Sequence, residues 1–84
     1  MHDFHLAETI YKVIMDYGAK NNLKKITKAV IELGQIVEHG EEVLAENLDF
    51  NIKMLAQGGP AEGIELIIEK GQGADWKLKE IDGD

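Results

Sequence analysis

Residues 26–33 read Ile-Thr-Lys-Ala-Val-Ile-Glu-Leu, and this stretch sets the class of fold. Its side chains alternate with period two, which is the period of a β-strand and not of a helix. The pattern therefore predicts a strand with one fully apolar face. The two expected faces are Thr27, Ala29, Ile31 and Leu33 on one side, and Ile26, Lys28, Val30 and Glu32 on the other.

A helical pattern lies on either side of this strand. Apolar residues at three- and four-residue spacing predict a helix over about 4–21, with Asp3 as its N-cap and Asn22 as its left-handed stop. A second stripe predicts a helix over about 41–57, with Glu41 and Glu42 near its positive end. The apolar stripes are Leu6, Ile10, Val13, Ile14 and Tyr17 in the first helix, and Leu44, Leu48, Ile52 and Leu55 in the second.

The rest of the chain contains two more strand patterns. They cover residues 64–70 and 76–81, and the turn Gly71-Gln72-Gly73 between them favours a hairpin. The element order is therefore α-β-α-β-β. We expect an α/β fold in which two helices pack on one face of a three-stranded mixed sheet, with residues 1–84 forming a single domain. The pattern leaves the strand order open. Tyr11, Phe50, Met54 and Trp76 are expected to pack against the core rather than to bind a ligand.

Composition excludes several classes of function. The 84 residues contain no cysteine, so disulfides, thiolate zinc sites and Cys nucleophiles are absent. The net charge of −7 argues against nucleic acid and anionic membranes as partners. No apolar run approaches the roughly 18 residues of a membrane span. No catalytic constellation is visible either, so we expect a cytoplasmic protein that is not an enzyme.

The histidines are the residues with the most distinctive chemistry. At position 2, the imidazole of His2, the α-amine and a deprotonated backbone amide can form linked chelate rings around one ion. Such nitrogen donors suit square-planar Ni(II) or Cu(II). From these residues alone, His2 is either a metal ligand or a polar residue on a frayed end. His5 is either an auxiliary ligand or a surface histidine, and His39 belongs either to a mixed His/carboxylate site or to a solvated loop.

Five blocks of sequence together carry a family resemblance. The chain opens with Met1-His2-Asp3 and continues Leu-Ala-Glu-Thr-Ile over 6–10. The later blocks are Thr-Lys (27–28) with Ile-Glu-Leu-Gly (31–34), Ala-Glu-Asn-Leu-Asp-Phe (45–50) with Leu-Ala-Gln-Gly (55–58), Ala-Glu-Gly-Ile-Glu-Leu-Ile-Ile (61–68) and Trp-Lys-Leu-Lys-Glu-Ile-Asp (76–82). In this order, the blocks resemble the HypA/HybF family, the nickel-insertion proteins of NiFe-hydrogenase and urease maturation.

The resemblance implies a nickel metallochaperone. In the family, the N-terminal amine, the amides of residues two and three and the imidazole of residue two hold Ni(II). Carried over, these ligands belong to Met1, His2 and Asp3, with His5 as a possible auxiliary. The resemblance also implies two partners, a HypB-like GTPase and the hydrogenase large subunit, and the same two-helix, three-strand fold.

Three departures from the family pattern qualify this interpretation. The zinc domain with its Cys-x-x-Cys pairs is missing, so no zinc is expected. Residue 3 is Asp where Glu is usual, and the stretch 34–48, which includes His39, is about four residues longer than usual. The alternative function is therefore a zinc-less HypA-like module for protein interaction, with vestigial or no metal binding.

Overall fold

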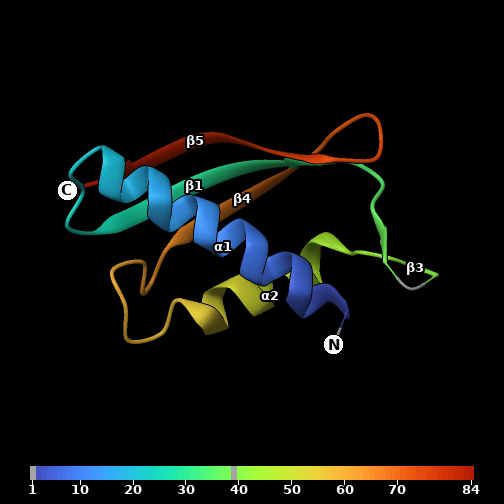
Figure 1. Ribbon diagram of the computed structural model, residues 1–84, viewed down its shortest axis with the longest axis horizontal. Coiled ribbons are helices and arrows are strands. Elements are labelled where there is room, and N and C mark those ends of the chain that lie inside the picture. Colours follow the sequence, from blue (N-terminus) through green and yellow to red (C-terminus); the bar gives the residue numbers. More distant parts are fainter. Residues whose placement is uncertain (1, 39) are drawn as a thin grey trace.

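The computed structural model describes residues 2–38 and 40–84, and the side chains of residues 5–37 and 40–84. In this part of the chain, two helices cover one face of a three-stranded sheet, and a short two-stranded hairpin stands beside them (Figure 1). The elements are α1 (His2–Lys20), β1 (Ile26–Leu33), β2 (Val37–Glu38), β3 (Glu41–Glu42), α2 (Ala45–Leu55), β4 (Glu65–Lys70) and β5 (Trp76–Gly83). The predicted α/β architecture is confirmed.

The three-stranded sheet is mixed, with the strand order β4-β1-β5. β1 pairs with β4 in parallel and with β5 antiparallel. The predicted hairpin between 64–70 and 76–81 is therefore wrong, because β1 lies between β4 and β5. β1 takes the central place since it buries apolar residues on both faces: Ala29 and Ile31 are fully buried on one face, and Val30 is only 7% exposed on the other. Strands on both sides are needed to cover it.

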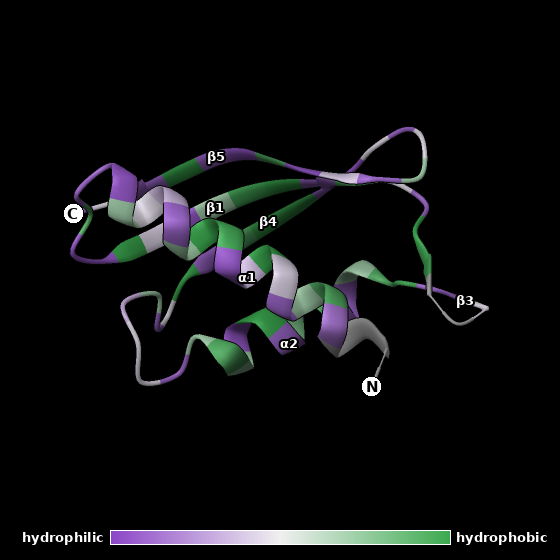
Figure 2. Cartoon of the chain, in the orientation of Figure 1, coloured by the Kyte–Doolittle hydropathy of each residue, from purple (hydrophilic) through white to green (hydrophobic). Residues whose placement is uncertain are grey.

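The hydrophobic core fills the space between the helices and β1. Figure 2 shows hydrophobic residues along β1 and at recurring positions of both helices. Fully buried side chains come from all of these elements, which ties the helical layer to the sheet. The largest of them are Ile10 and Ile14 of α1, Ile26 and Ile31 of β1, and Leu48 and Ile52 of α2.

The two ends of α1 differ in how well the sequence predicts them. Asn22 has φ 58°, so the predicted left-handed stop is confirmed. The helix begins at His2, so Asp3 lies inside the first turn and the predicted N-cap is wrong. Leu6 and Ala7 are buried against the core, and this packing holds the beginning of the helix in place.

Tyr17 does not belong to the buried face of α1, contrary to prediction. Its side chain is 47% exposed. The row that faces the sheet is Ile10, Ile14 and Gly18, spaced by four residues, and all three are buried. A Cβ on Gly18 would lie 2.6 Å from Cδ1 of Ile26, so the missing side chain lets α1 approach the start of β1. Tyr17 is consequently turned aside toward β5.

The second helix begins later than predicted, at Ala45 instead of Glu41. Glu41 and Glu42 form β3, which pairs with β2 through Val37 opposite Glu42. The backbone N–H of Val43 then donates to the carbonyl oxygen of Ile36, at 2.8 Å. This pairing holds the residues before Leu44 in an extended conformation. The helix therefore cannot start at Glu41.

The exposed side of α2 also departs from the prediction. Leu48 and Ile52 are buried as expected, but Leu44 precedes the helix and is 47% exposed. Phe50 and Met54, predicted to pack, are 65% and 45% exposed. They lie on the side of α2 away from the buried pair. Tyr11 and Trp76 do pack against the core, as predicted.

Candidate metal centre

His2, Asp3 and His5, three of the predicted metal ligands, belong to the beginning of α1. Figure 1 places this end of the chain at the same side of the molecule as the β2–β3 hairpin. The first described side chain, His5, is exposed, and the hydroxyl of Thr9 donates to its backbone carbonyl oxygen at 3.2 Å. The imidazole of His5 is therefore accessible to an ion from solvent, while its backbone is held within the helix.

The structure leaves the rest of the predicted donor set untested. Met1 lies outside the described residues, as do the side chains of His2 and Asp3. His39, the other candidate ligand, also lies outside them. The nickel site at Met1, His2 and Asp3, with His5 as auxiliary, therefore stays a prediction.

The backbone of α1 is compatible with the predicted amide ligands. Because α1 begins at His2, the amides of His2 and Asp3 belong to its first turn. The first four N–H groups of a helix have no acceptor within that helix. A metal ion that displaces the protons of these two amides would therefore break no helical hydrogen bond.

The described residues contain no other candidate metal centre. Among the side chains of residues 5–37 and 40–84, no group of three or more His, Cys, Asp or Glu is arranged to hold an ion. The acidic residues of this part are instead dispersed over the surface, and some pair with lysines, as Asp49 does with Lys53 at 3.3 Å. The same part of the chain has no helix long and apolar enough to cross a membrane.

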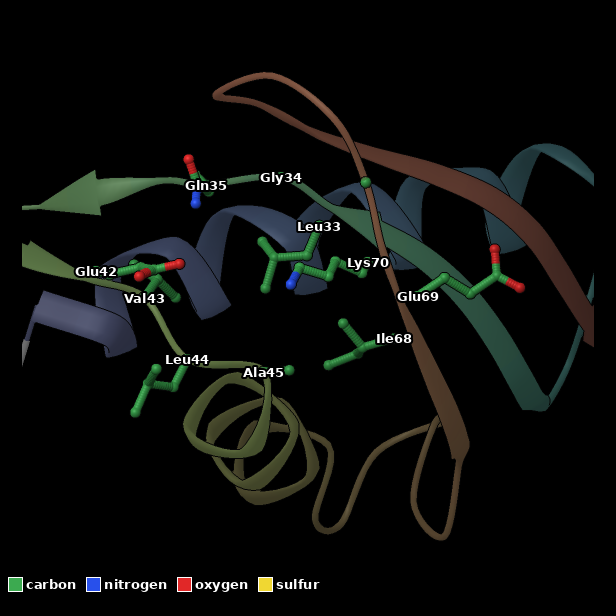
Figure 3. Close-up of a pocket in the computed structure, with 11 residues that line it drawn as sticks. Leu33, Gly34, Gln35, Glu42, Val43, Leu44, Ala45, Ile68, Glu69 and Lys70 are labelled. Atoms are coloured by element: carbon green, nitrogen blue, oxygen red, sulfur yellow. The ribbon is translucent and has the colours of Figure 1, made fainter.

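A cavity that the sequence did not predict lies where β1 and β4 end and α2 begins (Figure 3). Its volume is about 220 Å³, and the side chains of Leu33, Val43 and Ile68 line it. Glu42, Glu69 and Lys70 are the charged residues of its lining. Because small-molecule sites usually measure about 300–1,000 Å³, this cavity is too small to serve as one. The cavity lies where the carboxyl ends of the parallel strands β1 and β4 meet, and the sequence pattern leaves their pairing open.

Comparison with known proteins places the chain in a family. Residues 1–76 match the family model described as "Hydrogenase/urease nickel incorporation, metallochaperone, hypA". The chain belongs to the HypA family. The match includes the first three residues, where the predicted ligands lie, and ends where β5 begins.

Individual HypA proteins are similar over most of this chain. The "Hydrogenase maturation factor HypA" of Pyrococcus abyssi is 35% identical over 89 residues, which cover 96% of this chain and 61% of the relative. The HypA of Aquifex aeolicus is 36% identical over 69 residues, which cover 82% of this chain and 56% of that protein. The chain thus spans about three fifths of the length of the curated relatives that it matches.

A solved HypA structure has the same fold. The solution structure of the Ni metallochaperone HypA from Helicobacter pylori superposes with a TM-score of 0.78. The alignment covers 98% of this chain and 97% of that chain, at 11% sequence identity. At this identity the likeness supports the arrangement of helices and strands, but not the identity of any ligand.

Proposed function

We propose that this HypA chain carries Ni(II) at its N-terminus and delivers it during hydrogenase maturation. The observation that supports this most directly is the family match, which begins at residue 1 and so includes Met1, His2 and Asp3. The donors would be the α-amine of Met1, the backbone amides of His2 and Asp3, and the imidazole of His2. Ni(II) is the cargo of this protein, not a cofactor of a reaction.

The donor set suits a cargo that must be released. Four nitrogens in a plane favour Ni(II) and Cu(II) over hard cations such as Mg²⁺. The amine and both amides must lose a proton, and the imidazole must be neutral, so the ion binds near neutral pH and leaves in acid. Cu(II) is expected to bind more tightly than Ni(II) in vitro, as it does at most nitrogen sites.

Delivery requires ligand exchange and not catalysis by side chains. Thiolates or imidazoles of an acceptor would replace the four nitrogens one at a time, since the ligands all lie within the first three residues of the chain. We propose that a HypB-like GTPase and the hydrogenase large subunit are the partners in this exchange. The compartment in which the exchange occurs would be the cytoplasm.

A calorimetric titration of Ni(II) into protein that starts at its own Met1 tests the proposal. We expect one ion per chain, release of protons, and a dissociation constant on the order of micromolar, or about −8 kcal/mol. His2→Ala should weaken binding at least tenfold, and one extra residue before Met1 should do the same because it displaces the amine. His5→Ala should change the constant less if the four nitrogens suffice.

His39→Ala tests the other candidate histidine, and it should leave the constant unchanged if Ni(II) is held by Met1, His2 and Asp3 alone. Nickel binding that is indifferent to both His2→Ala and the N-terminal extension would contradict the proposal. The function would then pass to the second candidate, a module for protein interaction. The exposed Phe50 and Met54 on α2 favour that candidate, since large apolar side chains in this position can contact a partner.

A further inference from the structure

The outer edge of β5 is a row of backbone groups that no strand of the described chain pairs with. The sheet order β4-β1-β5 places β5 at one edge, where it runs for eight residues, Trp76–Gly83. Long edge strands are templates for pairing with another strand. This strand is also electrically neutral, since two lysines balance two acidic residues, in a chain of net charge −7.

A β-bulge determines which side chains of β5 face the helices. Leu78 lies opposite Ile31 and Glu80 lies opposite Val30, so Lys79 is an extra residue between them. As a result, Leu78 and Ile81 both point toward the helical layer, where they pack partly against the core. Lys77 and Asp82 both point to the other face of the sheet.

A small groove with both apolar and charged residues in its lining lies beside this edge. It has a volume of about 200 Å³ and is lined by Tyr17, Leu78, Lys79, Glu80 and Ile81. Tyr17 is 47% exposed, and Leu78 and Ile81 are only partly buried. The edge of β5 therefore combines unpaired backbone groups with apolar side chains that are only partly buried.

We propose that β5 pairs antiparallel with β5 of a second copy of this chain, which joins the two sheets edge to edge. In the register centred between Lys79 and Glu80, Leu78 meets Ile81 of the second copy on the helical face. On the other face, Lys77 meets Asp82 of the second copy, and the two-fold symmetry repeats each contact. The bulge is essential here, because without it residues 78 and 81 would lie on opposite faces.

Lys79 does not obstruct this pairing, although a lysine in an edge strand commonly does. Its ammonium group lies 2.9 Å from Glu69 and 4.0 Å from Glu32, on the two other strands of its own sheet. The hydrogen bond and charge of Glu69 raise the pKa of Lys79. Because Lys79 is turned back over its own sheet, the charge match between copies rests on Lys77 and Asp82.

β4, the strand at the opposite edge of the sheet, does not have charges that complement those of a second copy in this way. A symmetrical antiparallel pairing of β4 centred on Ile67 would set Glu65 opposite Glu69 of a second copy. Like charges directly opposite each other destabilise a strand pair. β4 itself also carries a net negative charge, two glutamates against one lysine. The second copy therefore fits β5 and not β4.

Sedimentation equilibrium of the chain, at about 0.15 M salt to screen the net charge, measures the association. We expect a mass that rises with concentration from 9.3 kDa toward twice that value. Lys77→Asp and Asp82→Lys should each weaken dimerisation roughly tenfold or more, because each turns two attractive pairs into two repulsive ones. A strictly monomeric chain up to about 1 mM would overturn the proposal and leave the edge to a strand of another protein.

Mixing the two variants gives the decisive result. A heterodimer of Lys77→Asp with Asp82→Lys restores opposite charges at both positions, so the mixture should associate although neither variant does alone. This rescue also shows that the variants are folded. Failure of the mixture to associate while circular dichroism shows native folding would overturn the proposed register.

Two control variants in β4, at the other edge of the sheet, introduce the same changes in charge as the two β5 variants. Glu65→Lys is matched to Asp82→Lys, because both residues lie opposite Lys28 in the sheet. Lys70→Asp is matched to Lys77→Asp in charge. Both controls should leave the dimer intact, and a dimer that they weaken as much as the β5 variants would contradict an interface at β5.

Discussion

Gly18 lies where α1 packs against the start of β1. A glycine inside a helix costs about 1 kcal/mol relative to alanine, so the sequence alone suggests a site that could be improved. The structure gives the reason for its presence: an added Cβ would lie 2.6 Å from Cδ1 and 3.1 Å from Cγ1 of Ile26. Ile26 is 2% exposed and has little room to move.

We therefore expect Gly18→Ala to destabilise the protein, by about 1 kcal/mol. Overpacking costs roughly 1–3 kcal/mol, which exceeds the gain of about 1 kcal/mol in helix propensity. Ile26→Val removes Cδ1 and should cost about 1 kcal/mol by itself. The double variant should lose less than the sum, because the alanine methyl fills the space left by Cδ1. Urea unfolding of all four proteins measures this coupling, and strict additivity would contradict the contact.

The candidate ligands show the limit of prediction at the residue scale. The chemistry of His2 alone leaves it either a metal ligand or a polar terminal residue, because one imidazole near an amine does not define a site. The resemblance to the HypA family favours the first alternative, in which His2 is a metal ligand. The family model matches residues 1–76 and so shows the family. The titration with Ni(II) tests the ligands.

Among the elements, α2 is the one whose start the sequence predicted least well. The stripe Leu44, Leu48, Ile52 has perfect helical spacing, so it indicates a helix that includes Leu44 and begins before it. The pairing of β2 with β3 prevents this, and two-residue strands leave almost no periodic signal. Leu44 becomes the N-cap instead, with φ −92° and ψ 141° and no side-chain hydrogen bond to the helix.

Leu44→Asp should therefore stabilise α2 relative to Leu44→Ala, by about 1 kcal/mol. An aspartate at the N-cap accepts a hydrogen bond from a backbone N–H of the first turn, and its charge favours the positive end of the helix. Both variants lose the leucine side chain, so their difference isolates the cap. Thermal unfolding compares them, and equal midpoints would show that the first turn of α2 does not accept a capping side chain.

At the scale of the whole molecule, the layers were predictable and the strand order was not. Periodicity assigns both helices and the long strands, and apolar faces require that they stack. The five residues between β4 and β5 would fit a hairpin, so the sequence predicts that these two strands pair with each other. The overlooked signal is Val30, an apolar residue on the far face of β1 that requires partners on both sides.

β5 should consequently be essential for folding, although the family match ends where this strand begins. It is one of the two strands that pair with β1, and Leu78 and Ile81 pack against the core. We expect a chain of residues 1–75 to lose its cooperative thermal transition. A chain of residues 1–82 is the control, because it loses only the end of β5 and the backbone bonds of Asp84 to Lys24 and Lys25.

The control should still unfold cooperatively, with a midpoint lowered by about 4–8 °C for each 1 kcal/mol lost. The contrast between the two truncations separates the strand from the chain terminus. If residues 1–75 unfolded cooperatively near the midpoint of the intact chain, the two helices with β1 and β4 would form a complete core. β5 would then not be needed for folding. A strand that the fold does not need could not hold two copies together rigidly.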